Sequence, residues 1–329
     1  MEAKCIKFYE FGRPDDVLQI ENKRIHRPQS GEVLVRMITR PINPSDLIPI
    51  HGAYSHRISL PAIPGYEGVG IIEDVGPFVS QDLIGKRVLP LRGEGTWQEY
   101  VRTSAELAIP IPQSIEDNTA AQLYINPVTA WLICSEVLAL KPDEVLLVNA
   151  CGSSIGRIFV QLSKILGFEL IAVTRNHFYT EELLQLGASQ VIDTSVTSLH
   201  STVRELTNGR GASAAIDSIG GPAGSELASC VHPNGTLLTI GLLSGVPINW
   251  ADISKRTKVN IKMFHLRHWN QQVPVKAWHE TFNRLIAFIL DKKLTLMEPS
   301  AHFDLLEVQQ AIRAAESSKN NSGKIFLTS

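Results

Sequence analysis

Between about residue 144 and residue 241, short apolar runs alternate with segments of helical periodicity. The runs are short enough to be strands buried on both faces, and glycines end the helices that follow them. The predicted strands are 144–148, 170–174, 190–193, 214–218 and 236–241, with helices at 157–166 and 180–186. Alternation of this kind builds an α/β fold with a doubly wound parallel sheet.

The first 118 residues have a different composition and a different predicted secondary structure. Proline recurs throughout this stretch, which leaves little room for long helices, and 32–37 and 68–76 are typical of short strands. After about residue 270 the pattern predicts helices at 276–290 and 306–317 and a last strand at 324–327. A chain of 329 residues is about right for two domains, and the change of texture places the first boundary near 118.

Composition excludes several classes of protein. The net charge is −2, with 31 basic and 33 acidic residues well mixed, so we expect neither a nucleic-acid nor a membrane partner. No apolar run approaches the roughly 20 residues that span a bilayer. The N-terminus lacks a signal core, which predicts a cytoplasmic protein. The cysteines stand far apart in apolar surroundings, as reduced, buried thiols do: Cys5, Cys134, Cys151 and Cys230.

A turn of small residues follows the strand at 144–148. Small residues let backbone N–H groups approach a phosphate, and the helix N-terminus favours its charge. Of the fingerprint G-x-G-x-x-G, only Gly152 and Gly156 are glycine. The pattern predicts a dinucleotide phosphate site at Gly152, Ser153, Ser154 and Ile155. The alternative is a tight strand-to-helix turn without a ligand.

The end of the next strand indicates which dinucleotide binds. NAD-specific sheets place Asp or Glu here to bind the ribose 2′-hydroxyl, and in this chain the first acidic residue after the strand is Glu181. Arg175 is instead suited to a 2′-phosphate, with His177 as a second donor. We therefore predict NADPH as the cofactor. The alternative is that Arg175 is a solvated surface residue.

Nine segments carry a family resemblance that spans nearly the whole chain. The chain resembles the medium-chain dehydrogenase/reductase superfamily and, within it, the zinc-free branch of quinone oxidoreductases and 2-enoyl thioester reductases. It is most similar to the mitochondrial-type 2-enoyl thioester reductases, with which it shares the Asn-Pro-x-Thr-Ala segment, the Asn-Ala start of the phosphate turn and the Phe-x-Leu-x-x-Trp run. The segments are Pro41–Asp46, His51–Tyr54, Pro61–Gly70, Tyr124–Trp131, Asn149–Gly156, Leu186–Ala188, Ile219–Gly221, Met263–Trp269 and Gly323–Ile325.

The resemblance implies a GroES-like catalytic domain, 1–118 plus 270–329, and a Rossmann NADPH-binding domain, 119–269, that forms a homodimer. Gly241, Leu242 and Leu243 are predicted to bind the cofactor because they follow a strand end, where doubly wound sheets bind ligands. The resemblance implies further cofactor-binding residues. These residues are Asn43 and Asn126 beside the cofactor, Phe264 and Leu266 at the nicotinamide, and Lys324 on the phosphates. For three of these sites an alternative stays open: an Asx turn at Asn43, core packing at Phe264 and Leu266, and a surface lysine at Lys324.

Zinc enzymes of this superfamily carry Cys and His ligands that this chain lacks. Asn43 stands at the expected cysteine, and Tyr66 replaces the histidine of a Gly-His-Glu motif. No cysteine occurs in 89–100, where a structural zinc loop is expected. We therefore predict no metal, and with no Lewis acid the zinc type of alcohol oxidation is not expected.

The remaining chemistry is hydride transfer to an electron-poor double bond. An α,β-unsaturated carbonyl accepts hydride at the β-carbon, and its α-carbon then needs a proton. Tyr54 matches the tyrosine that thioester reductases carry as proton donor, although quinone reductases often have one too, and an ordinary loop tyrosine is the alternative. His265, Arg267 and His268 add basic character where that subgroup often has aromatic residues, which leaves the substrate open.

Three functional hypotheses follow. The first is an NADPH-dependent oxidoreductase that reduces activated C=C bonds or quinones. The second is a specific 2-enoyl thioester reductase of fatty acid synthesis, acting on enoyl-ACP or enoyl-CoA. The third, of another class, is a non-catalytic NADPH-binding sensor. In the first two, the substrate is a small quinone, enone or enoyl thioester.

Overall fold

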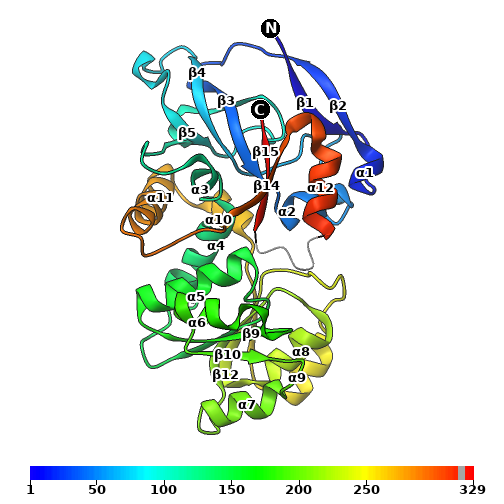
Figure 1. Ribbon diagram of the computed structural model, residues 1–329, viewed down its shortest axis with the longest axis vertical. Coiled ribbons are helices and arrows are strands. Elements are labelled where there is room, and N and C mark those ends of the chain that lie inside the picture. The colour runs from blue at the N-terminus through cyan, green and yellow to red at the C-terminus, as the bar shows by residue number, and fades with distance from the viewer. Residues whose placement is uncertain (318–322) are drawn as a thin grey trace. The chain divides into compact units, whose positions relative to one another are not determined.

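The computed structural model describes residues 1–317 and 323–329. The chain divides into two compact units, whose elements are labelled in Figure 1. Unit 1 comprises 1–125, 273–290 and 296–329, and unit 2 comprises 126–272 and 291–295. The helix predicted at 276–290 therefore belongs to unit 1, together with the C-terminal strand.

Unit 2 holds a six-stranded sheet in the order β10-β9-β8-β11-β12-β13, in which every neighbouring pair is parallel. This confirms the doubly wound prediction, because the order changes direction at β8, where such sheets bind ligands. The strands are β8 (Val145–Val148), β9 (Glu169–Thr174), β10 (Gln190–Asp193), β11 (Ala212–Asp217), β12 (Val231–Thr239) and β13 (Asn260–Met263).

The helices of unit 2 form two groups: α5 packs on α6, and α8 packs on α7 and α9, as Figure 1 shows. Leu147, Ile171 and Leu237 from three strands share one apolar core with Leu227 of α8. The helical elements are α4 (Ile125–Leu132), a π-helix (Ile133–Val137), α5 (Ser154–Leu166), a 3₁₀ turn (His177–Tyr179), α6 (Thr180–Leu186), α7 (Leu199–Leu206), α8 (Gly221–Ser229), α9 (Trp250–Arg256) and α10 (Leu266–Gln272).

Helix α5 begins at Ser154, so the predicted start at residue 157 was wrong. The Ser153 hydroxyl accepts a hydrogen bond from the Gly156 N–H at 3.2 Å and so caps the helix. The last residues of the small-residue turn therefore form the first helical turn. At the other end Gly167 takes a left-handed φ of 86°, which ends the helix as predicted.

Unit 1 is built on a seven-stranded mixed sheet. Its strands run in the order β14-β15-β3-β4-β5-β7, with β6 also paired to β3, and β1 and β2 form a separate hairpin. The strands are β1 (Glu2–Phe8), β2 (Leu18–Arg24), β3 (Glu32–Pro41), β4 (Val69–Val75), β5 (Arg87–Pro90), β6 (Tyr100–Ser104), β7 (Ala108–Pro110), β14 (Pro299–Asp304) and β15 (Lys324–Thr328). The helices are α1 (Pro14–Val17), α2 (Pro44–Ile50), α3 (Asp117–Ala121), α11 (Val275–Leu290) and α12 (Val308–Ser317), with 3₁₀ turns at Ser55–Arg57, Gln81–Leu83, Ala105–Leu107 and Leu305–Glu307.

The core of unit 1 explains two sequence features. Trp97 is fully buried and packs with Ile6, Ile50 and Leu327, so it is a core residue. Gly65 lies against it with φ 91°, where a Cβ would stand 2.3 Å from the indole.

All four cysteines are buried and free of disulfides, as predicted. Across residues 1–317 and 323–329, no helix has the length and apolarity that a bilayer crossing requires.

Candidate functional site

Three predicted cofactor segments follow strands of the unit 2 sheet. Residues 149–156 follow β8, Arg175 follows β9, and Gly241–Leu243 follow β12. Because these strands are parallel, their carboxyl ends lie on one edge of the sheet. The Cys151 N–H donates to the Val173 carbonyl at 3.4 Å, which ties the turn directly to the end of β9. The sheet therefore brings the predicted phosphate turn and Arg175 together.

Packing requires the two glycines of this turn. A Cβ on Gly156 would stand 2.5 Å from the Cα of Cys151, so only glycine lets α5 start this close to the strand. A Cβ on Gly152 would stand 2.5 Å from the ring of Tyr179. That ring also lies under the Arg157 guanidinium, 4.9 Å from the ring centroid. Gly152 thus serves the fit of Tyr179, a reason that the motif alone does not indicate.

A buried pair next to this turn was missed from the sequence. The Asn149 side-chain amide donates to the Asp217 carboxylate at 2.6 Å, and its carbonyl oxygen accepts from the Ser218 N–H at 2.8 Å. The same carboxylate accepts from the Gly220 N–H at 3.0 Å. These bonds join the ends of β8 and β11 at the point where the strand order changes direction. The sequence offered one signal, since a charged residue ends an otherwise apolar strand.

Arg175 and His177 are exposed after β9, and His177 opens the 3₁₀ turn. An acid does lie on the neighbouring strand end, because Asp193 pairs in register with Thr174. Its carboxylate accepts from the Ser195 N–H and hydroxyl at 2.9 and 2.7 Å, and the hydroxyl bond is the main reason that the pKa of Asp193 is lowered. The carboxylate of Asp193 is therefore already hydrogen-bonded within its own turn.

The remaining predicted residues of unit 2 lie in two places. Asn126 is on the first turn of α4, half-buried. Phe264 and Leu266 are half-buried around the junction of β13 and α10, and the Phe264 N–H donates to the Thr239 carbonyl at 3.0 Å. Their contacts with a nicotinamide stay predictions.

Unit 1 brings Asn43 and Lys324 into direct contact, although neither is near the other in the sequence. The Lys324 ammonium donates to the Asn43 side-chain oxygen, and the Asn43 amide donates to the Glu67 carboxylate at 2.7 Å. The other Glu67 oxygen accepts from the N–H groups of Tyr124 at 3.2 Å and Ile125 at 2.7 Å. Lys324 is buried, so the alternative of a surface lysine was wrong. Its predicted contact with cofactor phosphates stays a prediction.

A second carboxyl group joins this buried cluster. Asp46 caps α2 by accepting from the Asn43 N–H at 2.7 Å, and it also accepts from the Tyr66 N–H at 3.1 Å. Burial raises the pKa of Asp46 to about 7, and burial likewise raises the pKa of Glu67 and lowers that of Lys324. Asp46 was not predicted as a site residue, although its place three residues after the helix-capping Asn43 is a capping-box signal.

The residues at the expected zinc position do not fit a cation. Glu67 already accepts three N–H bonds, and the Asn43 oxygen faces the Lys324 ammonium, which would repel a metal ion. Within the described parts of the chain, no three His, Cys, Asp or Glu side chains are grouped as a metal site would need.

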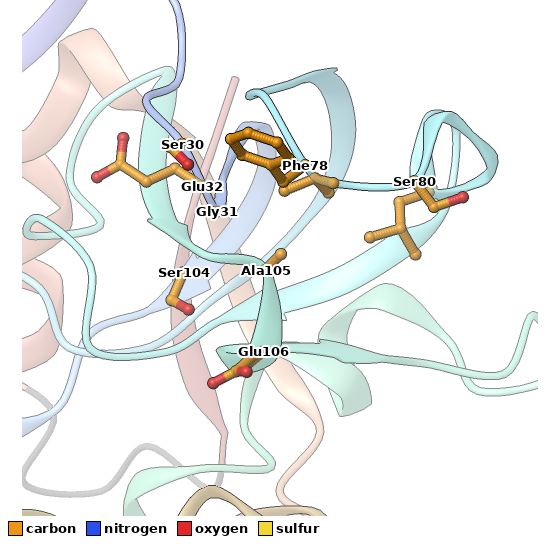
Figure 2. Close-up of a pocket in the computed structure, with 10 residues that line it drawn as sticks. Ser30, Gly31, Glu32, Phe78, Ser80, Ser104, Ala105 and Glu106 are labelled. Carbon is orange, nitrogen blue, oxygen red and sulfur yellow. The ribbon is translucent and has the colours of Figure 1, made fainter.

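Tyr54 lies just beyond α2, where it precedes the 3₁₀ turn Ser55–Arg57. The Arg57 N–H donates to the Tyr54 carbonyl at 3.0 Å, and the Arg57 guanidinium carbon lies 3.7 Å from the centroid of the Tyr54 ring. A hollow of about 540 Å³ also lies on unit 1, lined by Phe78, Ser104 and Glu106 among others (Figure 2). No predicted site residue lines this hollow.

Two family models match the chain. The model of the alcohol dehydrogenase GroES-like domain matches residues 29–113, and the model named zinc-binding dehydrogenase matches residues 154–289. A mitochondrial enoyl-[acyl-carrier-protein] reductase of Rattus norvegicus is 30% identical over 320 residues, which cover 95% of this chain and 85% of that protein. The corresponding reductase of Xenopus tropicalis is 30% identical over 279 residues, which cover 83% of this chain and 79% of that protein. The chain belongs to the medium-chain dehydrogenase/reductase superfamily.

Solved structures place it in the quinone oxidoreductase and enoyl thioester reductase branch of that superfamily. A "putative NADPH:quinone reductase" of Bacillus thuringiensis is 60% identical, with a TM-score of 0.98 over 100% of this chain and 99% of that one. The quinone oxidoreductase of Escherichia coli in complex with NADPH is 25% identical, with a TM-score of 0.89 over 99% and 100%. The predicted family and both predicted folds are thus confirmed. The family model named for zinc binding matches residues 154–289, a segment that contains neither Asn43 nor Glu67.

Proposed function

We propose that this chain is an NADPH-dependent oxidoreductase that transfers hydride to an activated C=C bond or a quinone. The observation that carries the proposal is the edge of the unit 2 sheet, where a small-residue turn opens the 13-residue helix α5 beside Arg175. Backbone N–H groups at the helix start suit a pyrophosphate, and a guanidinium suits a 2′-phosphate. The NADPH-bound relative of Escherichia coli supports the same cofactor.

NADPH would supply the hydride when bound, and the chain would supply its binding and a proton. We propose that the residues predicted for the cofactor hold it. The Ser153 hydroxyl caps α5 and the Ser153 N–H donates to the Ala150 carbonyl at 2.9 Å, so we propose that Ser153 shapes the turn around the phosphates. Lys324 and Asn43 form one bonded pair, so we propose that Lys324 fixes the orientation of the Asn43 amide. Tyr54 is the proposed proton donor to the α-carbon or to the oxygen of the reduced substrate.

The second candidate is a reductase specific for 2-enoyl thioesters. It is favoured by the enoyl-[acyl-carrier-protein] reductases that are 30% identical across most of this chain. The first candidate is favoured by the quinone reductase that is 60% identical. The two differ in what they turn over rather than in fold.

A direct assay tests both candidates. Loss of NADPH is followed with crotonyl-coenzyme A and with phenanthrenequinone, each compared with NADH as reductant.

Tyr54→Phe is expected to lower kcat with crotonyl-coenzyme A by about 100-fold or more, because the α-carbon loses its proton donor. The matched control is Tyr9→Phe, an exposed tyrosine of unit 1 outside the proposed site. Binding of NADPH without turnover of any acceptor would instead support a sensor.

We also propose a homodimer formed through the edge strand β13. All four of its residues are exposed in this chain, including Ile261 and Met263 at 40% and 75%. An exposed strand with open backbone groups and apolar side chains is a template for pairing with a second copy.

A further inference from the structure

The 3₁₀ turn after α2 folds the Arg57 side chain back onto Tyr54. The Arg57 N–H bonds to the Tyr54 carbonyl three residues earlier, and this tight turn brings the two side chains to the same side. The guanidinium carbon then lies 3.7 Å from the ring centroid, which is stacking distance. Both side chains are half-buried, so the contact is partly shielded from water.

The face of a tyrosine ring carries negative charge density, which attracts a guanidinium. That attraction grows when the phenol loses its proton, because the phenolate spreads a full negative charge over the same ring. A residue stacked on the ring can therefore favour proton donation without touching the substrate.

We propose that Arg57 is a positioning residue of the reduction, acting through Tyr54 by stabilising the phenolate formed when Tyr54 gives up its proton. The inference rests on the proposed function. Hydride from NADPH reduces the C=C bond at the β-carbon and leaves an enolate. The Tyr54 O–H bond then breaks, and the electron pair of the enolate forms the new C–H bond at the α-carbon with that proton. A proton from solvent restores the phenol.

The test is a double-mutant cycle with Arg57→Met, Tyr54→Phe and the double variant, using crotonyl-coenzyme A and NADPH. Met keeps an apolar side chain on the ring but removes the charge, so kcat is expected to fall about 3- to 30-fold with KM nearly unchanged. Arg57→Lys is expected to recover part of this loss. In the Tyr54→Phe background, Arg57→Met is expected to change kcat less than about twofold. Arg27→Met, an exposed arginine of unit 1, is the control.

Several outcomes would overturn the inference. Additive losses in the double variant would show that Arg57 acts apart from Tyr54. A rise in KM for crotonyl-coenzyme A alone, with crotonyl-pantetheine unaffected, would assign Arg57 to the phosphates of the substrate. An unchanged kcat in a folded Arg57→Met variant, checked by its melting temperature, would also contradict it. A Tyr54→Phe variant that keeps the wild-type kcat would likewise overturn the inference, because Tyr54 would then not be the proton donor. The proposed function fails separately, if the wild-type protein turns over neither crotonyl-coenzyme A nor phenanthrenequinone with NADPH.

Discussion

Asp46 is a buried carboxyl group whose charge is opposed by burial, and it makes the stability of unit 1 depend on pH. Burial raises its folded pKa to about 7 from the ordinary value of 3.8. Between about pH 4 and pH 7 the folded state therefore holds a proton that the unfolded chain has lost, so stability falls as pH rises through this window.

Asp46→Asn is expected to remove this dependence. The free energy of unfolding of the wild type, measured relative to the variant, is expected to fall by an amount on the order of 1–4 kcal/mol between pH 4 and pH 7.5. Urea unfolding at a series of pH values measures it, with Asp16→Asn, an exposed carboxyl group, as the control. A constant gap between wild type and Asp46→Asn across the window would contradict the prediction.

Ala150 occupies a backbone conformation that favours glycine. Its φ is 52°, in the left-handed region, at the start of the predicted phosphate turn. Ala150→Gly is expected to raise the free energy of unfolding by about 0.5–1 kcal/mol, because relief of strain exceeds the added entropy of the unfolded chain. Ala251→Gly in the exposed part of α9 should have the opposite sign. Chemical denaturation compares the two, and equal destabilisation would show that Ala150 is unstrained.

At the scale of elements, β13 decides the proposed assembly. Ile261→Glu is expected to convert the dimer to a monomer, because a charge in a paired edge would be buried without a partner. Light scattering after size exclusion gives the mass. Ile20→Glu, on the exposed face of β2 in unit 1, is the control and should leave the mass unchanged. A dimeric Ile261→Glu variant, or a monomeric wild type, would place assembly elsewhere or exclude it.

At the scale of the whole molecule, cofactor binding is expected to stabilise the fold through mass action. NADPH at about 100 times its Kd should add about 2.7 kcal/mol to the free energy of unfolding.

Arg175→Ala is expected to weaken NADPH binding about 10- to 100-fold and to leave NADH binding unchanged, since only NADPH has the 2′-phosphate. Calorimetric titration measures both, with Arg204→Ala, an exposed arginine of α7, as control. Equal losses for both cofactors would remove Arg175 from the 2′-phosphate site.

The amino-acid sequence by itself determined the strand–helix alternation of unit 2, because apolar periodicity and terminal glycines are local signals. It also supplied the ordered segments that identify the superfamily. It misplaced the start of α5, since whether Ser153 caps a helix depends on the backbone that follows it.

Only the tertiary structure decided how the buried polar groups are paired. Lys324 contacts Asn43 across 281 positions of the chain, and Glu67 holds the N–H of Ile125 across 58. Asp217 likewise meets Asn149 only because β8 and β11 are neighbours in the sheet. Partners that are this far apart leave no local pattern, and a buried charge can be matched with its partners only after the strands that carry it have been paired.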